Sequence, residues 1–277
     1  MTEHAITAGG VTLAVADDGD GIPVVLLHGL TASRRYVVMG SGALQRAGHR
    51  VIAYDARGHG ASSPAPAPGE YGYEHLCADL AAVLDELEIE RAVLAGASMG
   101  AHTILRLALE QPERVAAMAI ITPGYDPVGF DDPQRLARWD ALADALRDEG
   151  IDGFVEAFGV QRLPEAWRDK LATVVRQRLA LHEHPAALVD ALRAVPRSRP
   201  FGDLHALEEI EISAVVVASR DEADPGHPLA LGEAYAELLP DARLVVEEPG
   251  ESPLAWRGGR LSSVIAELAA QAGVAGR

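Results

Sequence analysis

A serine stands in the pentapeptide GASMG, residues 96–100, which fits the pattern G-x-S-x-G. This pattern is typical of a serine on a sharp turn between a strand and a helix, where its hydroxyl stands clear of the sheet. Glycines on either side leave room for the tight backbone and for close packing of helix on strand. Ser98 is therefore a candidate nucleophile, above a helix N-terminus that favours negative charge. The alternative is a glycine-rich turn in which the serine is incidental.

A second motif, HGL at residues 28–30, follows the apolar run VVLL. At the end of a strand, the backbone N–H of Leu30 can join that of Met99 to form an oxyanion hole. His28 lies beside them as a candidate substrate-binding residue. A third motif, DARGHGAS at residues 55–62, follows another apolar run, and we interpret it as a structural loop held by its own charged side chains.

Short runs rich in β-branched residues, each ending in a loop, alternate with helical stretches. This alternation predicts βα units and a parallel sheet. The helical spacing is clear in YEHLCADLAAVLDELEI at 73–89, and GGRLSSVIAELAAQA at 258–272 is predicted as a closing helix. The predicted strands begin the segments 11–16, 24–29, 51–60, 92–100, 115–124, 214–221 and 243–250.

Residues 126–200 break this alternation, since they hold helical stretches and no good strand. We predict a helical insertion, with the α/β core formed by residues 1–125 and 201–277. The insertion is either a scaffold extension or a lid. Segments that follow strand ends in an open sheet tend to lie where ligands bind, which favours the lid.

Composition and charge restrict the classes of partner. The 277 residues carry a formal net charge of −17, which argues against nucleic acid and anionic membrane surfaces as partners. Cys77 is the only cysteine, so no internal disulfide can form. The first residues lack the basic and apolar regions of a signal peptide, and no apolar run is long enough to span a membrane. We expect a cytoplasmic protein that acts on or binds a small, apolar molecule.

Together these motifs give the chain its family resemblance. HGL at 28–30, DARGHGAS at 55–62, GASMGA at 96–101 and SRDEADP at 219–225 resemble the α/β-hydrolase superfamily in order and spacing, over nearly the whole chain. The resemblance, closest to cap-containing esterases and haloperoxidase-like enzymes, implies an eight-stranded, mostly parallel sheet with helices on both faces. It implies a Ser–acid–His triad, no metal and no organic cofactor. Fold alone does not select among the superfamily's activities.

The resemblance carries Ser98 over as nucleophile and Asp221 as the acid, with Asp224 as the runner-up and Asp126 as a more remote possibility. The superfamily's histidine normally follows the last strand, in a sequence like G-H-S-P. This chain reads PGESPL at 249–254, so that Glu251 stands where the histidine is expected. No histidine follows residue 227.

Several histidines are candidates for the general base. A normal triad runs serine, acid, histidine along the chain, and His227 alone follows Asp221 and Asp224. It would have to swing over Ser98 from a rim loop. The other candidates are weaker on position: His102 lies on the helix after the serine, His28 and His59 lie on loops near the site, and His182 and His184 lie on the insertion.

Glu251 is the remaining candidate for the base. If the resemblance holds, Asp221 and Glu251 face each other at the tips of adjacent strands. Two close carboxylates resist ionising together and share a proton, which would raise the pKa of Glu251 towards neutrality.

Three functions remain open from the sequence. The first is a serine hydrolase with an atypical triad, acting on a small ester, thioester or lactone. The second is a ligand-binding homologue with impaired or no catalysis, favoured by the missing histidine. The third is a lyase or isomerase that uses Asp221 and Glu251 for proton transfer.

Overall fold

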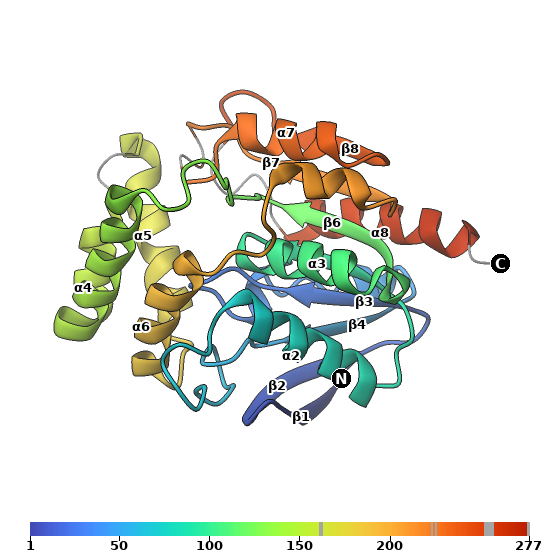
Figure 1. Ribbon diagram of the computed structural model, residues 1–277, viewed down its shortest axis with the longest axis horizontal. Helices are drawn as coiled ribbons and strands as arrows, with labels where there is room; N and C mark the ends of the chain where they lie inside the picture. Colours follow the sequence, from blue (N-terminus) through green and yellow to red (C-terminus); the bar gives the residue numbers. More distant parts are fainter. Residues whose placement is uncertain (161–162, 223, 225, 252–257, 276–277) are drawn as a thin grey trace.

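The computed structural model describes residues 1–160, 163–222, 224, 226–251 and 258–275. At its centre lies an eight-stranded sheet in the order β1-β2-β4-β3-β5-β6-β7-β8 (Figure 1). Strands β4, β3, β5, β6, β7 and β8 pair in parallel, whereas β2 pairs antiparallel with both β1 and β4. The strands are β1 Thr2–Ala8, β2 Val11–Asp18, β3 Ile22–Leu27, β4 His49–Tyr54, β5 Ala92–Ala97, β6 Val115–Ile121, β7 Ala214–Ala218 and β8 Ala242–Val246.

This sheet confirms the eight-stranded, mostly parallel fold that the family resemblance implies. The sequence analysis located seven of its strands, and β1 is the eighth. The alternation of β1 is weak, because its outer half is exposed and only Ile6 and Ala8 among its residues are buried. Central strands are apolar along their whole length, as strands covered on both faces must be.

Helices cover both faces of the sheet (Figure 1). Leu80 of α2, Ile104 of α3 and Tyr235 of α7 belong to the apolar core on one face. Leu44 of α1 and Ile265 of α8 belong to the core on the other face. The helices are α1 Ala43–Arg46, α2 Tyr73–Glu86, α3 Met99–Glu110, α7 Leu229–Leu238 and α8 Gly258–Ala275, with short 3₁₀ helices η1 Arg34–Tyr36, η2 Pro112–Arg114, η4 Val195–Arg197 and η5 Leu204–Glu209.

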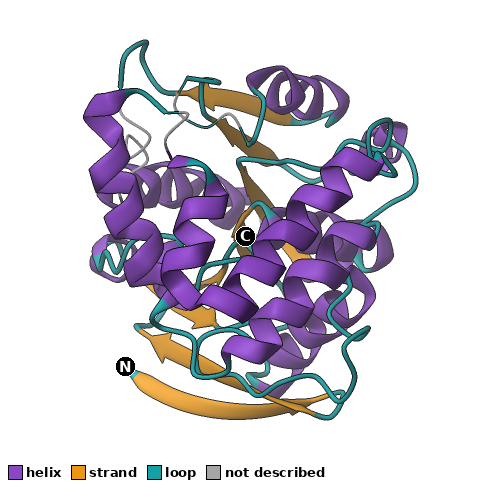
Figure 2. Ribbon diagram, turned by 90° about the vertical axis from the view of Figure 1, so that its left-hand side faces the viewer, coloured by secondary structure: helices purple, strands orange, loops and turns teal. Residues whose placement is uncertain are grey.

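Between β6 and β7 the chain forms three helices, α4 Pro133–Phe158, α5 Glu165–Leu179 and α6 Pro185–Ala194. They stack together beyond the carboxyl ends of the parallel strands (Figures 1 and 2). Phe154 and Leu188 of this insertion share an apolar cluster with Leu30 and Met99 of the core. The insertion therefore packs directly on the two loops that the sequence analysis assigned to an oxyanion hole.

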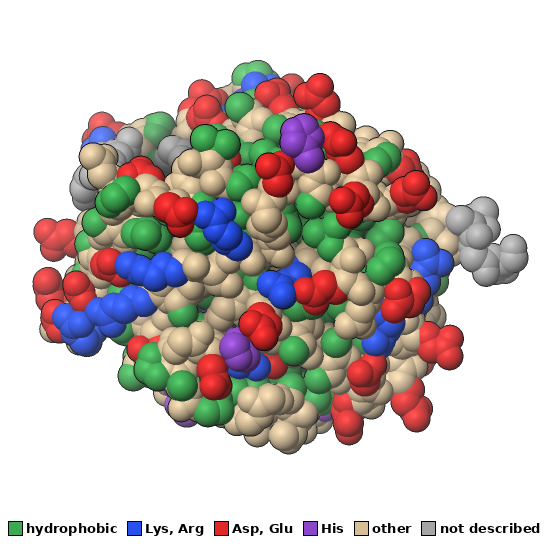
Figure 3. All heavy atoms as spheres, viewed as in Figure 1, with side chains coloured by type: hydrophobic (Ala, Val, Ile, Leu, Met, Phe, Trp, Pro, Cys, Tyr) green, Lys and Arg blue, Asp and Glu red, His purple; other side chains and the backbone are tan. Residues whose placement is uncertain are grey.

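The surface carries many more acidic than basic groups, since 41 aspartate and glutamate residues stand against 24 lysine and arginine residues. On the face drawn in Figure 3 the acidic side chains are spread over most of the surface and do not form a single patch. Within the described part of the chain, no helix combines the length and the apolar character needed to cross a bilayer.

Candidate active site

Ser98 lies between the end of β5 and the start of α3, in a backbone conformation with φ 49° and ψ −108° that a residue with a side chain rarely adopts. Gly96 and Gly100 are needed because the backbone of other residues packs against them too closely to admit a side chain. A Cβ on Gly96 would lie 2.5 Å from the carbonyl carbon of Gly100, and one on Gly100 would lie 2.3 Å from the Leu27 oxygen. The Ser98 amide donates to the Ile121 carbonyl at 2.9 Å. The local sequence thus builds a tight, strained turn that lifts the serine above the sheet.

Two hydrogen bonds connect Ser98 to the loop after β7. His227 Nε2 lies 2.9 Å from Ser98 Oγ, across 129 residues of chain. On the other side of the ring, His227 Nδ1 lies 2.8 Å from Asp224 Oδ2. An imidazole that donates from Nδ1 to a carboxylate presents an unprotonated Nε2 to the hydroxyl. The arrangement can accept a proton from the serine.

His227 and Asp224 each stabilise the charged form of the other. Burial lowers the pKa of His227, but the neighbouring Asp224 carboxylate outweighs burial and the pKa lies above its ordinary value. Burial likewise raises the pKa of Asp224, whereas the charge and hydrogen bond of His227 bring it below the ordinary value. Asp224 therefore stays ionised at neutral pH and stabilises a proton on His227.

The loop that carries both residues is fixed at its two ends. At its start the amide of Arg220 donates to Glu247 Oε1 at 2.7 Å and its Nε donates to the Glu247 carbonyl at 3.0 Å. At its end Asp221 Oδ1 accepts from the Leu229 amide at 2.7 Å, at the N-terminus of α7. Asp221, the acid carried over by resemblance, thus closes the loop instead of contacting His227.

Gly124, after β6, provides the surface on which His227 rests. A Cβ at this position would lie 2.8 Å from His227 Cδ2. The glycine allows the imidazole to lie against the backbone at the height of Ser98. The sequence offered no signal for this contact, because Gly124 and His227 are 103 positions apart in the printed numbering and belong to different loops.

Glu251 lies on the loop after β8 with its carboxylate fully engaged. Its oxygens accept from Arg260 Nη1 at 3.0 and 2.8 Å, and Oε2 also accepts from the Glu248 amide at 2.8 Å. These hydrogen bonds lower the pKa of Glu251. Among the described residues no hydrogen bond joins Glu251 to Asp221. Asp221 and Glu251 therefore do not share a proton as expected, because each carboxylate has a different partner. The pKa of Glu251 is lowered instead of raised.

Leu30 and Met99 are buried next to the turn that carries Ser98. A Cβ on Gly29 would lie 3.7 Å from Ser98 Cβ, so the loop after β3 runs beside the serine. Met99 is the first residue of α3, and an amide in that position has no acceptor within its own helix. Within the described ranges the Leu30 amide donates to no backbone carbonyl outside the strands and helices. Both donors are available to an oxygen bound above Ser98.

Three other histidines hold loops near the site. His28 Nε2 accepts from the Ala56 amide at 2.9 Å, and its Nδ1 donates to the Gly29 carbonyl at 2.8 Å. His59 lies between the carbonyls of Arg57 and Leu30, at 2.8 and 2.6 Å. His182 accepts from the Gly60 amide at 2.9 Å. Their rings are occupied by backbone groups, so the structure gives none of them contact with the serine hydroxyl.

His102 and His184 also lie away from the serine hydroxyl. His102 Nε2 accepts from the amides of Gly124 and Tyr125, both at 3.1 Å, and burial lowers its pKa to about 3. This neutral ring supports the loop on which His227 rests. His184 precedes α6 on the insertion, and its backbone carbonyl accepts from the Ala187 and Leu188 amides.

Asp126, the remote candidate for the acid, lies on the loop after β6. Its Oδ1 accepts from the Val128 amide at 2.8 Å. The side chain therefore stabilises its own turn, whereas His227 Nδ1 pairs with Asp224.

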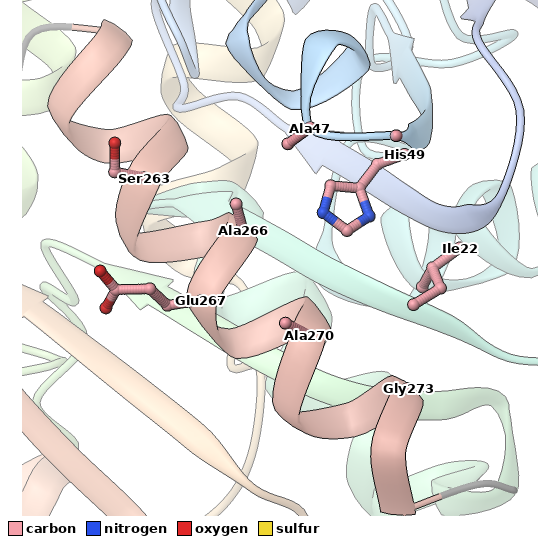
Figure 4. Close-up of a pocket in the computed structure, with 9 residues that line it drawn as sticks. Ile22, Ala47, His49, Ser263, Ala266, Glu267, Ala270 and Gly273 are labelled. Atoms are coloured by element: carbon pink, nitrogen blue, oxygen red, sulfur yellow. The ribbon is translucent and has the colours of Figure 1, made fainter.

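A separate open groove of about 980 Å³ lies between α8 and the beginnings of β3 and β4. Figure 4 shows Ile22 and His49, the first residues of these strands, opposite Ala266, Ala270 and Gly273 of α8. The groove is at the amino edge of the sheet, whereas Ser98 follows the carboxyl end of β5. It therefore forms no part of the arrangement around the serine.

Comparisons with known proteins identify the family to which the fold belongs. Residues 22–254 match the family model described as "alpha/beta hydrolase fold". The chain is 30% identical over 231 residues to a protein of Pseudomonas savastanoi pv. phaseolicola named "Putative carbamate hydrolase RutD", covering 82% of this chain and 85% of the relative.

Solved structures show the same fold. A thermophilic esterase from Thermogutta terrifontis superposes with a TM-score of 0.80 at 24% identity, covering 98% of this chain and 99% of that one. The enol-lactonase from Burkholderia xenovorans gives a TM-score of 0.75 at 21% identity, covering 96% and 99%. With its family model matched over most of its length, the chain belongs to the α/β-hydrolase family.

Proposed function

We propose that this protein is a serine hydrolase that cleaves a small ester or lactone through Ser98, His227 and Asp224. The observation that carries the proposal is the continuous hydrogen-bond chain from Ser98 Oγ to His227 and on to Asp224, at 2.9 and 2.8 Å. A nucleophile, a base and a group that orients the base within hydrogen-bond reach is the signature of an activated serine. The relative named as a carbamate hydrolase supports acyl chemistry at this site and adds carbamates to the substrates worth testing.

The reaction proceeds in two acyl-transfer steps. His227 Nε2 takes the proton of Ser98 as Oγ forms a bond to the acyl carbon, and the imidazolium then gives this proton to the departing alcohol oxygen as the C–O bond breaks. In the second step His227 takes a proton from water, the hydroxide adds to the acyl carbon, and Ser98 leaves with the proton. The products are one carboxylic acid and one alcohol, or a hydroxy acid from a lactone.

The amides of Leu30 and Met99 are proposed to stabilise the negative oxygen that develops on the acyl carbon. Both lie beside Ser98, and Met99 opens α3, whose N-terminus favours negative charge. His28 acts through the loop: its hydrogen bonds to Gly29 and Ala56 fix the position of Leu30. The triad is atypical because acid and base are three residues apart on one loop after β7.

The alternative functions receive less support. A lyase or isomerase that relies on Asp221 and Glu251 needs carboxylates free to exchange protons, and both are bound to other groups. A purely ligand-binding homologue does not need an aligned Ser98–His227–Asp224 chain.

Labelling with a fluorophosphonate probe followed by peptide mass spectrometry tests the proposal without knowledge of the substrate. We expect modification at Ser98 in the wild-type protein, loss of labelling in His227→Ala, and full labelling in Glu251→Gln. Glu251 is the matched control, since it occupies the superfamily's usual histidine position. Failure to label folded wild-type protein, or labelling that survives His227→Ala unchanged, would contradict the proposed mechanism.

A further inference from the structure

The inner face of α5 carries one cation towards the site. Val175 and Leu179 of this helix belong to the apolar cluster that contains Leu30 and Met99. Arg178 lies three positions after Val175 and next to Leu179, on the same side of the helix. Arg178 therefore leaves α5 on the side that packs on the core, and its side chain is partly buried.

The end of α5 is docked on the loops around the site. His182 Nδ1 accepts from the Gly60 amide at 2.9 Å and its Nε2 donates to the Thr31 carbonyl at 3.3 Å. The Glu183 amide donates to the Gly60 carbonyl at 2.9 Å. Thr31 follows Leu30 directly, so these contacts hold the last turn of α5, with Arg178, over the proposed oxyanion hole.

No carboxylate among the described residues pairs directly with the Arg178 guanidinium. Its Nε is buried and makes no hydrogen bond, and none of the described residues forms an ion pair with the side chain. The contrast is Arg176, two positions earlier, which pairs with exposed Asp152 at 2.9 Å on the outer face. An arginine held partly buried without a partner is unfavourable unless a ligand supplies the counter-charge.

The charge of Arg178 interacts with Tyr36 and Asp224, which follow strands on opposite sides of β5. Burial lowers the pKa of Arg178 to about 10, against the opposing effects of Tyr36 on the loop after β3 and Asp224 on the loop after β7. These strands are three positions apart in the sheet, about 14 Å, with β5 and its Ser98 between them. The guanidinium thus remains charged at neutral pH, within electrostatic reach of the Asp224 carboxylate that contacts His227.

We infer that Arg178 binds a carboxylate of the substrate, so that the preferred substrate is a small ester or lactone carrying a second, anionic group. This inference rests on the proposed hydrolase function and gives its substrate class. The planar guanidinium fork matches a carboxylate. The Asp224 carboxylate close to Arg178 makes a doubly charged phosphate the less suitable anion.

Two matched substrate pairs test the inference. The first is the mono-p-nitrophenyl ester of adipate against its methyl ester, with the charge on the acyl part. The second is p-acetoxybenzoate against its methyl ester, with the charge on the leaving group. We expect Arg178→Gln to raise KM for the anionic member of one pair by about 10- to 100-fold, and to change KM for its neutral partner by less than about threefold. Arg178→Lys should recover part of the loss.

Arg176→Gln is the control, because it removes a charge from the same helix on the outer face. Fluorophosphonate labelling of Ser98 in Arg178→Gln reports that the variant folds and that the triad is intact. Equal changes for charged and neutral esters, or no change for either pair, would overturn the inference.

Calorimetric titration with adipate and with p-hydroxybenzoate separates this inference from the hydrolase proposal. If wild-type protein neither labels nor hydrolyses any ester, the hydrolase proposal fails, yet weaker binding of one anion to Arg178→Gln than to Arg176→Gln still supports the anion site. Binding that is equal in both variants, or absent from wild-type protein, overturns it.

Discussion

The loops after β7 and β8 leave neighbouring parallel strands at the same edge of the sheet, and both carry carboxylates. In the loop after β7, Asp224 contacts His227 and His227 contacts Ser98. In the loop after β8, Glu251 turns to Arg260 of α8 and to the Glu248 amide. The position at which the sequence resemblance places the family's histidine therefore holds a side chain with a local structural partner, while the neighbouring loop carries the proposed base and acid.

The difference shows that the partner of a carboxylate, more than its position in the fold, determines what it can do. Asp224 is ionised next to an imidazole that needs its charge, whereas Glu251 is ionised next to an arginine that neutralises it. The loops are also linked, because Glu247 at the end of β8 accepts the Arg220 amide that begins the other loop. The loop after β8 thus supports the loop after β7.

The largest difference in kcat is expected between variants that each replace one of the two candidate bases, His227 and Glu251. His227→Ala should lower kcat for a p-nitrophenyl ester by roughly 10⁴- to 10⁶-fold, because Ser98 loses the group that accepts its proton. Glu251→Gln should remain within about threefold of wild type, since its contacts are to Arg260 and a backbone amide. Steady-state kinetics on both variants decides. If Glu251→Gln shows the greater loss, the roles of the two loops are reversed.

The next largest difference in kcat is expected between variants of the two acids on the loop after β7, Asp224 and Asp221. Asp224→Asn is expected to lower kcat by about 10⁴-fold, because an amide neither fixes the tautomer of His227 nor stabilises its charge. Asp221→Asn should leave kcat nearly unchanged and lower Tm by about 2–4 °C, through the weakened contact with the Leu229 amide. Kinetics and thermal unfolding of the pair measure this. A comparable kcat loss in Asp221→Asn would make Asp221 the functional acid.

A smaller effect should follow from moving the base without removing it. In Gly124→Ala the new methyl would meet His227 Cδ2 at 2.8 Å, so the ring must shift. A displacement of this kind can cost about 10²-fold in kcat. Gly250→Ala is a weaker control, since an added Cβ there meets no atom within 4 Å, although its φ of 80° carries backbone strain. Unchanged kcat in a folded Gly124→Ala variant would mean that the contact does not set the position of His227.

Much of the fold could be predicted from the sequence, because the apolar runs are long and each ends in a recognisable turn. The position of Ser98 on a turn between a strand and a helix could also be predicted, since GASMG encodes its own turn. The side chain that hydrogen-bonds to Ser98 could not be selected from the candidate histidines and Glu251. Both Asp221 and Asp224 precede His227 in suitable order, and only the bonds from Arg220 to Glu247 and from Asp221 to Leu229 determine which carboxylate faces the ring. These contacts join residues across loops and leave no periodic pattern.

The expectation about Glu251 differs from the structure for a related reason. The sequence aligned its position with a histidine but did not show that Arg260, nine residues further on, would turn back to it. Arg178 was not singled out either, since an arginine on an amphipathic helix is ordinarily solvated. That its buried Nε makes no hydrogen bond to the described residues becomes visible only when α5 is docked on the core.

The smallest change expected is a shift of the pH profile, and its sign distinguishes the two loops. His227 must be neutral to accept a proton, and the Asp224 carboxylate raises its pKa above the ordinary value against the effect of burial. We therefore expect kcat/KM to rise with pH and to reach half its maximum above about pH 6.5. Glu251 as base would place this midpoint below about pH 4.5, because its hydrogen bonds lower its pKa. In Asp224→Asn burial is no longer opposed, so the residual activity should reach its midpoint at lower pH than in wild type. Profiles of kcat/KM against pH for wild type, Asp224→Asn and Glu251→Gln measure this, and a midpoint that moves in Glu251→Gln but not in Asp224→Asn would assign the titrating base to the loop after β8.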